Sequence, residues 1–200
     1  MLIDEDHPSV WSAWAQRAHD ELHSHGVDFT GGFRPDEIHA CEQELGIRLP
    51  PELSTFLAVG VPVSERWARW AEGPSAVAEG ARKWLDDAFT FDVRQNGYWH
   101  DHLGPRPATD EAAIEVALAA VHAAPMLVPI YAHRFLVTEP AAGLRPVLSV
   151  WQPTDAIIYG KDLADYLHRE FGITRPSWAA DNVDEIPVWG DLLYIFGDPA

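Results

Sequence analysis

Apolar residues recur at spacings of three and four along the first part of the chain, which predicts amphipathic helices. Residues 8–25 form the first, with an apolar face of Trp11, Ala15, Ala18 and Leu22. A second helix starts at Pro35 and ends at Gly46, because glycine favours the left-handed conformation that closes helices. A third starts at Pro50-Pro51 and has an inward face of Leu53, Phe56 and Leu57.

The middle of the chain is rich in tryptophan and mixes helical with extended patterns. Residues 64–88 predict a helical region that is broken near Gly73-Pro74. Residues 89–93 alternate between apolar and polar side chains, which predicts a strand. The alanine-rich stretch 109–124 has acids in its first turn and Pro125 after its end, so it predicts another helix.

Short apolar runs replace the helical spacing in the last third. Residues 127–131, 146–151 and 156–159 predict strands of one small sheet, and Asp162 opens a closing helix that ends at Gly172. Helices that come first and strands that come later are typical of an α+β fold. We therefore expect one domain with a small central, mostly antiparallel sheet flanked by helices.

The same pattern divides this domain into three parts. We expect an N-terminal helical extension at 1–33 and an α+β core at 34–172. The core contains a tryptophan-rich helical insert at about 61–88. The tail at 173–200 mixes proline, acids and aromatic residues, so we expect it to pack over the core.

Charge narrows the possible partners. The chain has 14 Lys and Arg against 31 Asp and Glu, a net charge of −17. Such a field repels phosphate backbones and anionic lipid headgroups, so we expect neither nucleic acid nor a membrane as a partner. The field attracts a basic protein, although acidity alone also serves solubility.

The single cysteine and the chain start both indicate a cytoplasmic location. Cys41 has no second cysteine with which to form an internal disulfide. Residues 1–6 are acidic and lack the basic and apolar regions of a secretory signal. No run reaches the roughly 18 apolar residues that cross a bilayer.

Two blocks of sequence carry the pattern of a known family. Residues 37–57 contain an acidic helix ending in Leu45-Gly46, then Leu49-Pro50, then a helix that closes in Phe56-Leu57. The second block comprises the paired strands and closing helix at 146–150, 157–160 and 162–167. In this order the blocks resemble the SUKH superfamily (the Smi/Knr-type cell-wall-assembly regulators and bacterial immunity proteins) across residues 34–171.

The resemblance implies an α+β fold and a role in binding proteins. Bacterial members are often immunity proteins of toxin–antitoxin type that neutralise cognate toxins, many of them nucleases, and fungal members regulate cell-wall assembly. The family has no shared enzymatic residues to carry over. We therefore expect a non-enzymatic immunity or adaptor protein without a cofactor, whose protein partner is a candidate basic toxin domain.

Aromatic residues next to acids are the candidate partner-binding residues. An interface ring fills a pocket on the partner, and a nearby carboxylate meets a basic residue. The alternative for each ring is a place in the core. The candidates are Trp67 and Trp70 in the insert, Trp99 with Asp101, and Trp189 with Asp191 in the tail.

Two further function classes stay open at this point. In a strand, His100 and His102 share one face and can hold a metal ion, which suggests a metal-dependent hydrolase. A third ligand is available only from distant residues such as His122 and His133, and the alternative is a polar loop beside a packed ring. The other class is a small-ligand-binding regulatory domain, whose sign is a deep apolar pocket with a few converging polar groups.

Overall fold

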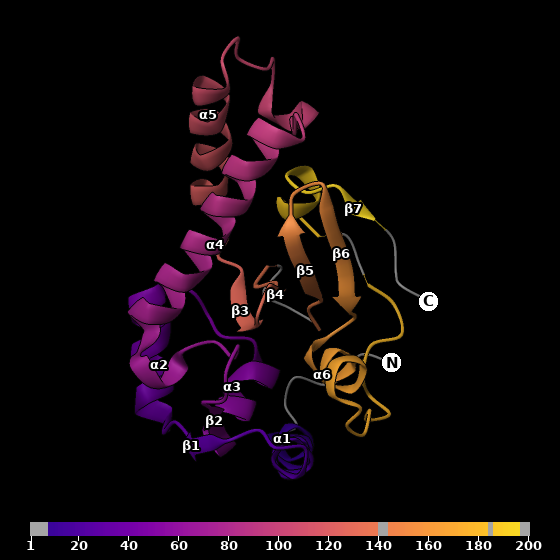
Figure 1. Cartoon of the computed structure of the whole chain (residues 1–200). Helices are drawn as coiled ribbons and strands as arrows, with labels where there is room; N and C mark the ends of the chain where they lie inside the picture. Colours follow the sequence, from indigo (N-terminus) through magenta and orange to yellow (C-terminus); the bar gives the residue numbers. More distant parts are fainter. Residues whose placement is uncertain (1–7, 140–143, 184–185, 197–200) are drawn as a thin grey trace.

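The computed structural model describes residues 8–139, 144–183 and 186–196. Figure 1 shows a small sheet with helices packed around it. The described helices are α1 (Pro8–Ser24), α2 (Pro35–Leu45), α3 (Pro51–Val59), α4 (Pro74–Gln95), α5 (Asp110–Ala123) and α6 (Leu163–Phe171), with short 3-10 helices at Trp70–Glu72, Asp101–Leu103 and Trp189–Asp191. The described strands are β1 (Phe29–Gly31), β2 (Gly60–Pro62), β3 (Val128–Tyr131), β4 (Arg134–Leu136), β5 (Val147–Gln152), β6 (Asp155–Gly160) and β7 (Ile195–Phe196).

The main sheet has the strand order β3-β4-β5-β6-β7. Neighbouring strands from β3 to β6 run antiparallel, and the short β7 lies parallel to β6. A separate antiparallel pair joins β1 to β2. The predicted α+β fold with a mostly antiparallel sheet is therefore confirmed.

Alternating side chains on the strands divide the interior into two clusters. The first cluster contains Leu136 and Val147 from the sheet, with buried residues of α1, α3 and α6. The second cluster contains Phe135 and Leu148 from the same strands, with buried residues of α4, α5 and the segment 186–193. Successive strand residues point to opposite faces, so each cluster covers one face of the sheet. Helices α4 and α5 lie side by side as a helical hairpin (Figure 1).

Two glycines end their helices as predicted. Gly46 after α2 has a φ of 68° and Gly172 after α6 has a φ of 70°. This left-handed region suits glycine because it has no Cβ. After α2 the backbone N–H groups of Gly46 and Ile47 both donate to the carbonyl of Glu42. The chain thus turns sharply toward α3, and the N-terminal helices are confirmed.

The predicted strand at 89–93 is wrong, because these residues lie inside α4. Ala81, Leu85, Phe89 and Val93 recur every four residues and form one buried stripe. Phe91, which a strand would have buried with Phe89, is exposed. Asp92 is buried and accepts hydrogen bonds from the backbone and hydroxyl of Thr154, at 2.8 and 2.7 Å. The alternation over these five residues is therefore part of the four-residue spacing of a long helix.

The insert is less helical at its start than predicted. Residues 64–69 form turns and irregular structure, and α4 begins only at Pro74. Thr30 and Gly31 belong to β1, which pairs with β2 at the start of the insert. Gly32 lies so close to the backbone of Ala58 that a Cβ would collide with it.

Both ends of the described chain pack on the body. The ring of Trp178 lies 4.6 Å from that of Trp11 and 5.5 Å from that of Trp14. Trp14 also contacts the ring of Phe56 on α3. Beyond Trp178, Trp189 joins the second cluster, so the tail contributes to both sides of the interior.

Candidate functional site

Three of the candidate partner-binding rings lie in the interior. Trp67 is 7%, Trp70 2% and Trp189 1% exposed. Trp67 stacks between Phe56 and Phe171, and the indole N–H of Trp189 donates to the carbonyl of Pro125 at 2.9 Å. This corrects the expectation that the three rings are surface anchors. A large ring stabilises the fold most where it buries its whole surface between several helices and strands, and these three rings lie at such places in the interior.

The remaining candidates come together at one surface. We call residues 99–102, 191 and 194 the turn-and-tail surface. The hydroxyl of Tyr194 donates to the carbonyl of Trp99 at 2.8 Å, and Asp191 Oδ1 lies 2.9 Å from His102 Nδ1. Asp101 and Asp191 are exposed. Segments far apart in sequence thus place two rings, two carboxylates and two imidazoles side by side.

The two histidines of the metal hypothesis lie in a turn rather than in a strand. His100 precedes the 3-10 helix Asp101–Leu103, and its ring lies 5.1 Å from that of His102. The suggested third ligands lie elsewhere: His122 pairs with Asp86 at 2.7 Å, and His133 stacks on Trp84. Among the described residues, no group of three or more His, Cys, Asp or Glu side chains has an arrangement that could hold a metal ion.

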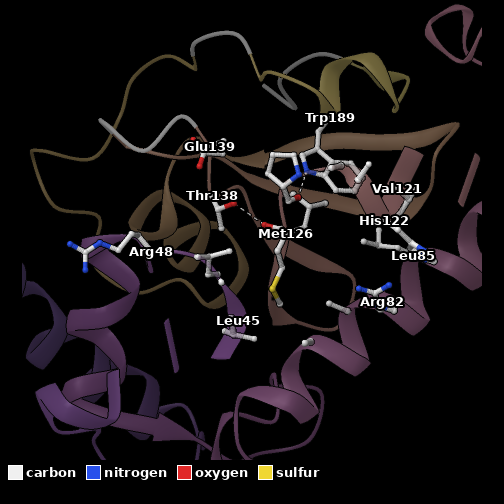
Figure 2. A pocket seen from close by; sticks show the side chains of 18 of the residues that line it. Leu45, Arg48, Arg82, Leu85, Val121, His122, Met126, Thr138, Glu139 and Trp189 are labelled. Atoms are coloured by element: carbon white, nitrogen blue, oxygen red, sulfur yellow. Dashed lines mark hydrogen bonds between the residues drawn. The ribbon is translucent and has the colours of Figure 1, made fainter. Parts of the chain in front are cut away.

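A cleft of about 950 Å³ opens where the two clusters meet (Figure 2). Its walls are the end of α2, the first half of α4, the end of α5, residues next to β3, β4 and β5, and Trp189. Leu45 packs on the first cluster, Leu85, Val121 and Trp189 belong to the second, and Met126 contacts both. Figure 2 shows Met126 between Leu45 and Trp189 on the floor. The floor is therefore apolar and formed by both halves of the interior.

Most basic side chains around the cleft already contact a carboxylate. Arg48 pairs with Glu42 at 3.2 Å, and His122 pairs with Asp86. In Figure 2 the guanidinium of Arg48 turns away from Met126. Arg82 is the exception, since no ion pair joins it to another described residue.

Two carboxylates line the cleft as well. Glu44 accepts a hydrogen bond from the Ser75 hydroxyl, and Glu139 is exposed. Within the described ranges, neither has an ion-pair partner. The lining therefore combines an apolar floor with acids at its edge.

A buried carboxyl group lies behind one wall. Arg145 lines the cleft and approaches Glu52, with its Nη1 3.9 Å from Glu52 Oε2. Burial raises the pKa of Glu52 from 4.5 to about 7, since burial disfavours the charged form. Neither carboxyl oxygen has a hydrogen-bond partner among the described residues. Glu52 therefore gains or loses its proton near neutral pH, and the net charge of the two side chains changes with it.

One exposed ring was not predicted from the sequence. Trp151, on β5, is 52% exposed and contacts Trp84 and His133, with ring centroids 5.6 and 5.1 Å away. The pairing of β5 with β6 shifts register between Val150 and Gln152, so simple alternation along the strand does not reveal the position of this ring. The sequence gives no signal for the cleft either, because its walls come from segments that lie far apart in the chain.

Comparisons with known proteins identify no relative of the chain. Searched against models of protein families, curated proteins and solved structures, the chain gives no significant match. The resemblance to the SUKH superfamily therefore stays a prediction from residues 37–57 and 146–167. No described helix has both the length and the apolar composition that crossing a membrane requires.

Proposed function

We propose that the chain is a non-enzymatic protein-binding domain of immunity or adaptor type, whose partner is a protein with a basic surface. The observation that carries the proposal is the turn-and-tail surface. There Asp101 and Asp191 flank Trp99 and the 39% exposed Tyr194. Carboxylates beside rings are a composition that suits protein interfaces.

The overall charge supports a basic partner. A net charge of −17 attracts a basic protein over a distance and raises its association rate. The resemblance to the SUKH superfamily supports the immunity version, in which that partner is a toxin domain. A cytoplasmic setting fits this proposal, since Cys41, the single cysteine, is buried and free of any disulfide.

Affinity capture from the native host with paired variants tests the proposal. Wild type should retain one basic protein in stoichiometric amount. The double variant Asp101→Lys/Asp191→Lys should lose it, because both changes place cations against a basic surface. The control Glu65→Lys/Glu115→Lys makes the same change of charge at exposed sites outside that surface and should retain the partner.

The salt dependence of association gives the second readout. The Debye length falls from about 10 Å at 0.1 M salt to about 3 Å at 1 M, so the association rate should fall steeply. A partner retained equally by both double variants, or an association rate that ignores salt, would contradict the proposal.

A small-ligand-binding role is the second candidate, and the cleft is the observation that favours it. Its volume of about 950 Å³ falls within the range of small-molecule sites, roughly 300–1,000 Å³. Native mass spectrometry of protein from its own host tests this role. A stoichiometric bound molecule supports it, and an unliganded mass counts against it.

A further inference from the structure

Two helices end at the cleft. Leu45 and Gly46 close α2, and His122, Ala123 and Ala124 close α5; all five line the cavity. The C-terminus of a helix carries a partial negative charge of roughly half an elementary charge, because its last carbonyls lack intrahelical partners. Cations are therefore favoured at this place before any side chain is counted.

The side chains at the edge add to this preference. Glu44 lies one residue before the end of α2 and lines the cleft, as does Glu139, which lies beside Thr138 (Figure 2). Arg48 pairs with Glu42, and His122 lies against Asp86, so these two side chains leave little positive charge to offer. The guanidinium of Arg145 is 6% exposed and lies next to Glu52 behind the wall. Arg82 alone opposes the trend. Together with the net charge of −17, the lining favours a cationic ligand.

The floor sets a second requirement. Leu45 and Met126 are half-buried and offer apolar surface on the floor, and the buried side chains of Leu85, Val121 and Trp189 line the same cavity. A bare inorganic cation would gain nothing from this apolar floor. Lysine and arginine combine an aliphatic stem with a charged head, and they bury the stem on apolar surface while the head stays polar.

We propose that the cleft is a docking groove for a lysine- or arginine-bearing segment of the partner protein. The aliphatic stem and a neighbouring apolar residue lie on the floor around Met126. The charged head lies between Glu44, Glu139 and the ends of α2 and α5. This inference rests on the proposed protein-binding function and adds a second contact site to it.

Binding of short peptides to the intact chain tests the groove. The probe is a rhodamine-labelled hexapeptide of alternating leucine and lysine, and the readout is fluorescence anisotropy. Two matched peptides replace every lysine with glutamate or with the uncharged norleucine. The lysine peptide should bind at least tenfold more tightly than either, a difference of about 1.4 kcal/mol.

Two pairs of variants separate the groove from the general acidity of the protein. Glu44→Gln/Glu139→Gln should weaken the lysine peptide about tenfold, whereas Glu65→Gln/Glu115→Gln, with the same change of net charge, should weaken it less than twofold. Ala78→Trp fills the cleft from α4 and should abolish binding. The control Ala119→Trp places the same ring on the exposed side of α5 and should leave binding intact.

The outcomes distinguish this inference from the function on which it rests. Equal weakening by both glutamine pairs, or tighter binding of the glutamate peptide, would overturn the groove. So would a small molecule that occupies the cleft in the host protein. If capture of a partner depends on Asp101 and Asp191 while the peptide ignores Ala78→Trp, the proposed function stands and the groove falls. If the peptide requires the cleft but no partner is captured, the proposed function fails instead.

Discussion

The two hydrophobic clusters cover opposite faces of one sheet, yet they are built differently. The first joins α1, α3 and α6, whose rings contact one another around Phe56 and Trp67. The second depends on one long helix, α4, its partner α5 and the tail residues 186–193. Where the two clusters meet, α2, α4 and α5 do not close over the sheet. The difference shows that the cleft is a consequence of how the two halves join.

The tryptophans offer the largest test of this comparison. Trp67 in the first cluster and Trp189 in the second are both buried, so replacing either with alanine should cost about 3–5 kcal/mol of unfolding free energy. The exposed Trp151 should lose less than about 1 kcal/mol on the same change. Urea unfolding followed by circular dichroism measures all three.

A specific pattern of results would show that the assignment of Trp67 and Trp189 to the core is wrong. If Trp67→Ala or Trp189→Ala keeps its stability but loses the partner, that ring is a surface anchor after all. The two variants should differ in their effect on the cleft. Trp189→Ala should enlarge it, since the Trp189 ring lines the cavity, whereas Trp67→Ala should leave it unchanged.

A pH titration tests the Glu52 and Arg145 pair behind the cleft. The folded protein holds the Glu52 proton up to about pH 7, while the unfolded chain loses it near pH 4.5. Between these values the unfolded state binds fewer protons, so the free energy of unfolding falls as the pH rises. This single group contributes a fall of roughly 3 kcal/mol, complete above pH 7.

The variant Glu52→Gln should remove that part of the pH dependence. Its stability relative to wild type should rise from pH 4.5 to pH 8, as measured by thermal or urea unfolding at each pH. Identical pH profiles for the variant and wild type would show that Glu52 is ionised in the folded protein at all these values.

The end of α2 offers the smallest test, at the edge of the cleft. Gly46 has a φ of 68°, so Gly46→Ala should cost about 1 kcal/mol through backbone strain alone, since no atom lies within 4 Å of the new Cβ. Gly31→Ala is the control, because its backbone has a negative φ and its Cβ also meets nothing. Equal stability of the two variants, measured by urea unfolding, would contradict the left-handed conformation of Gly46 at the end of α2.

The same comparison explains which parts of the fold the sequence predicts. Proline starts mark α2 and α3, Asp162 caps the start of α6, and a glycine follows each of the three; these helices were predicted correctly. Helix α4 has no such mark near residue 89, and its aromatic run favoured a strand over a longer period. Strand β4 spans only three residues and β7 two, too short for a pattern.

The sequence predicted which types of residue the candidate site contains, but not which of them lie on the surface or next to one another. Sequence alone cannot separate a ring that anchors a partner from one that fills a core, as Trp70 and Trp189 show. Trp99 and Asp101 were chosen as one pair and Asp191 as part of another, and only tertiary contacts such as Tyr194 to Trp99 and His102 to Asp191 join them. The cleft requires segments that are far apart in the chain to lie together, at residues 44–48, 75–85, 121–127, 138–139, 145 and 189.

Hydrogen–deuterium exchange of the captured complex tests whether the partner covers both the turn-and-tail surface and the cleft. We expect the partner to slow exchange at residues 98–103 and 189–195, and also at 44–48 and 121–127 around the cleft. Protection confined to the outer faces of α1 and α6, with no change at these segments, would contradict this expectation.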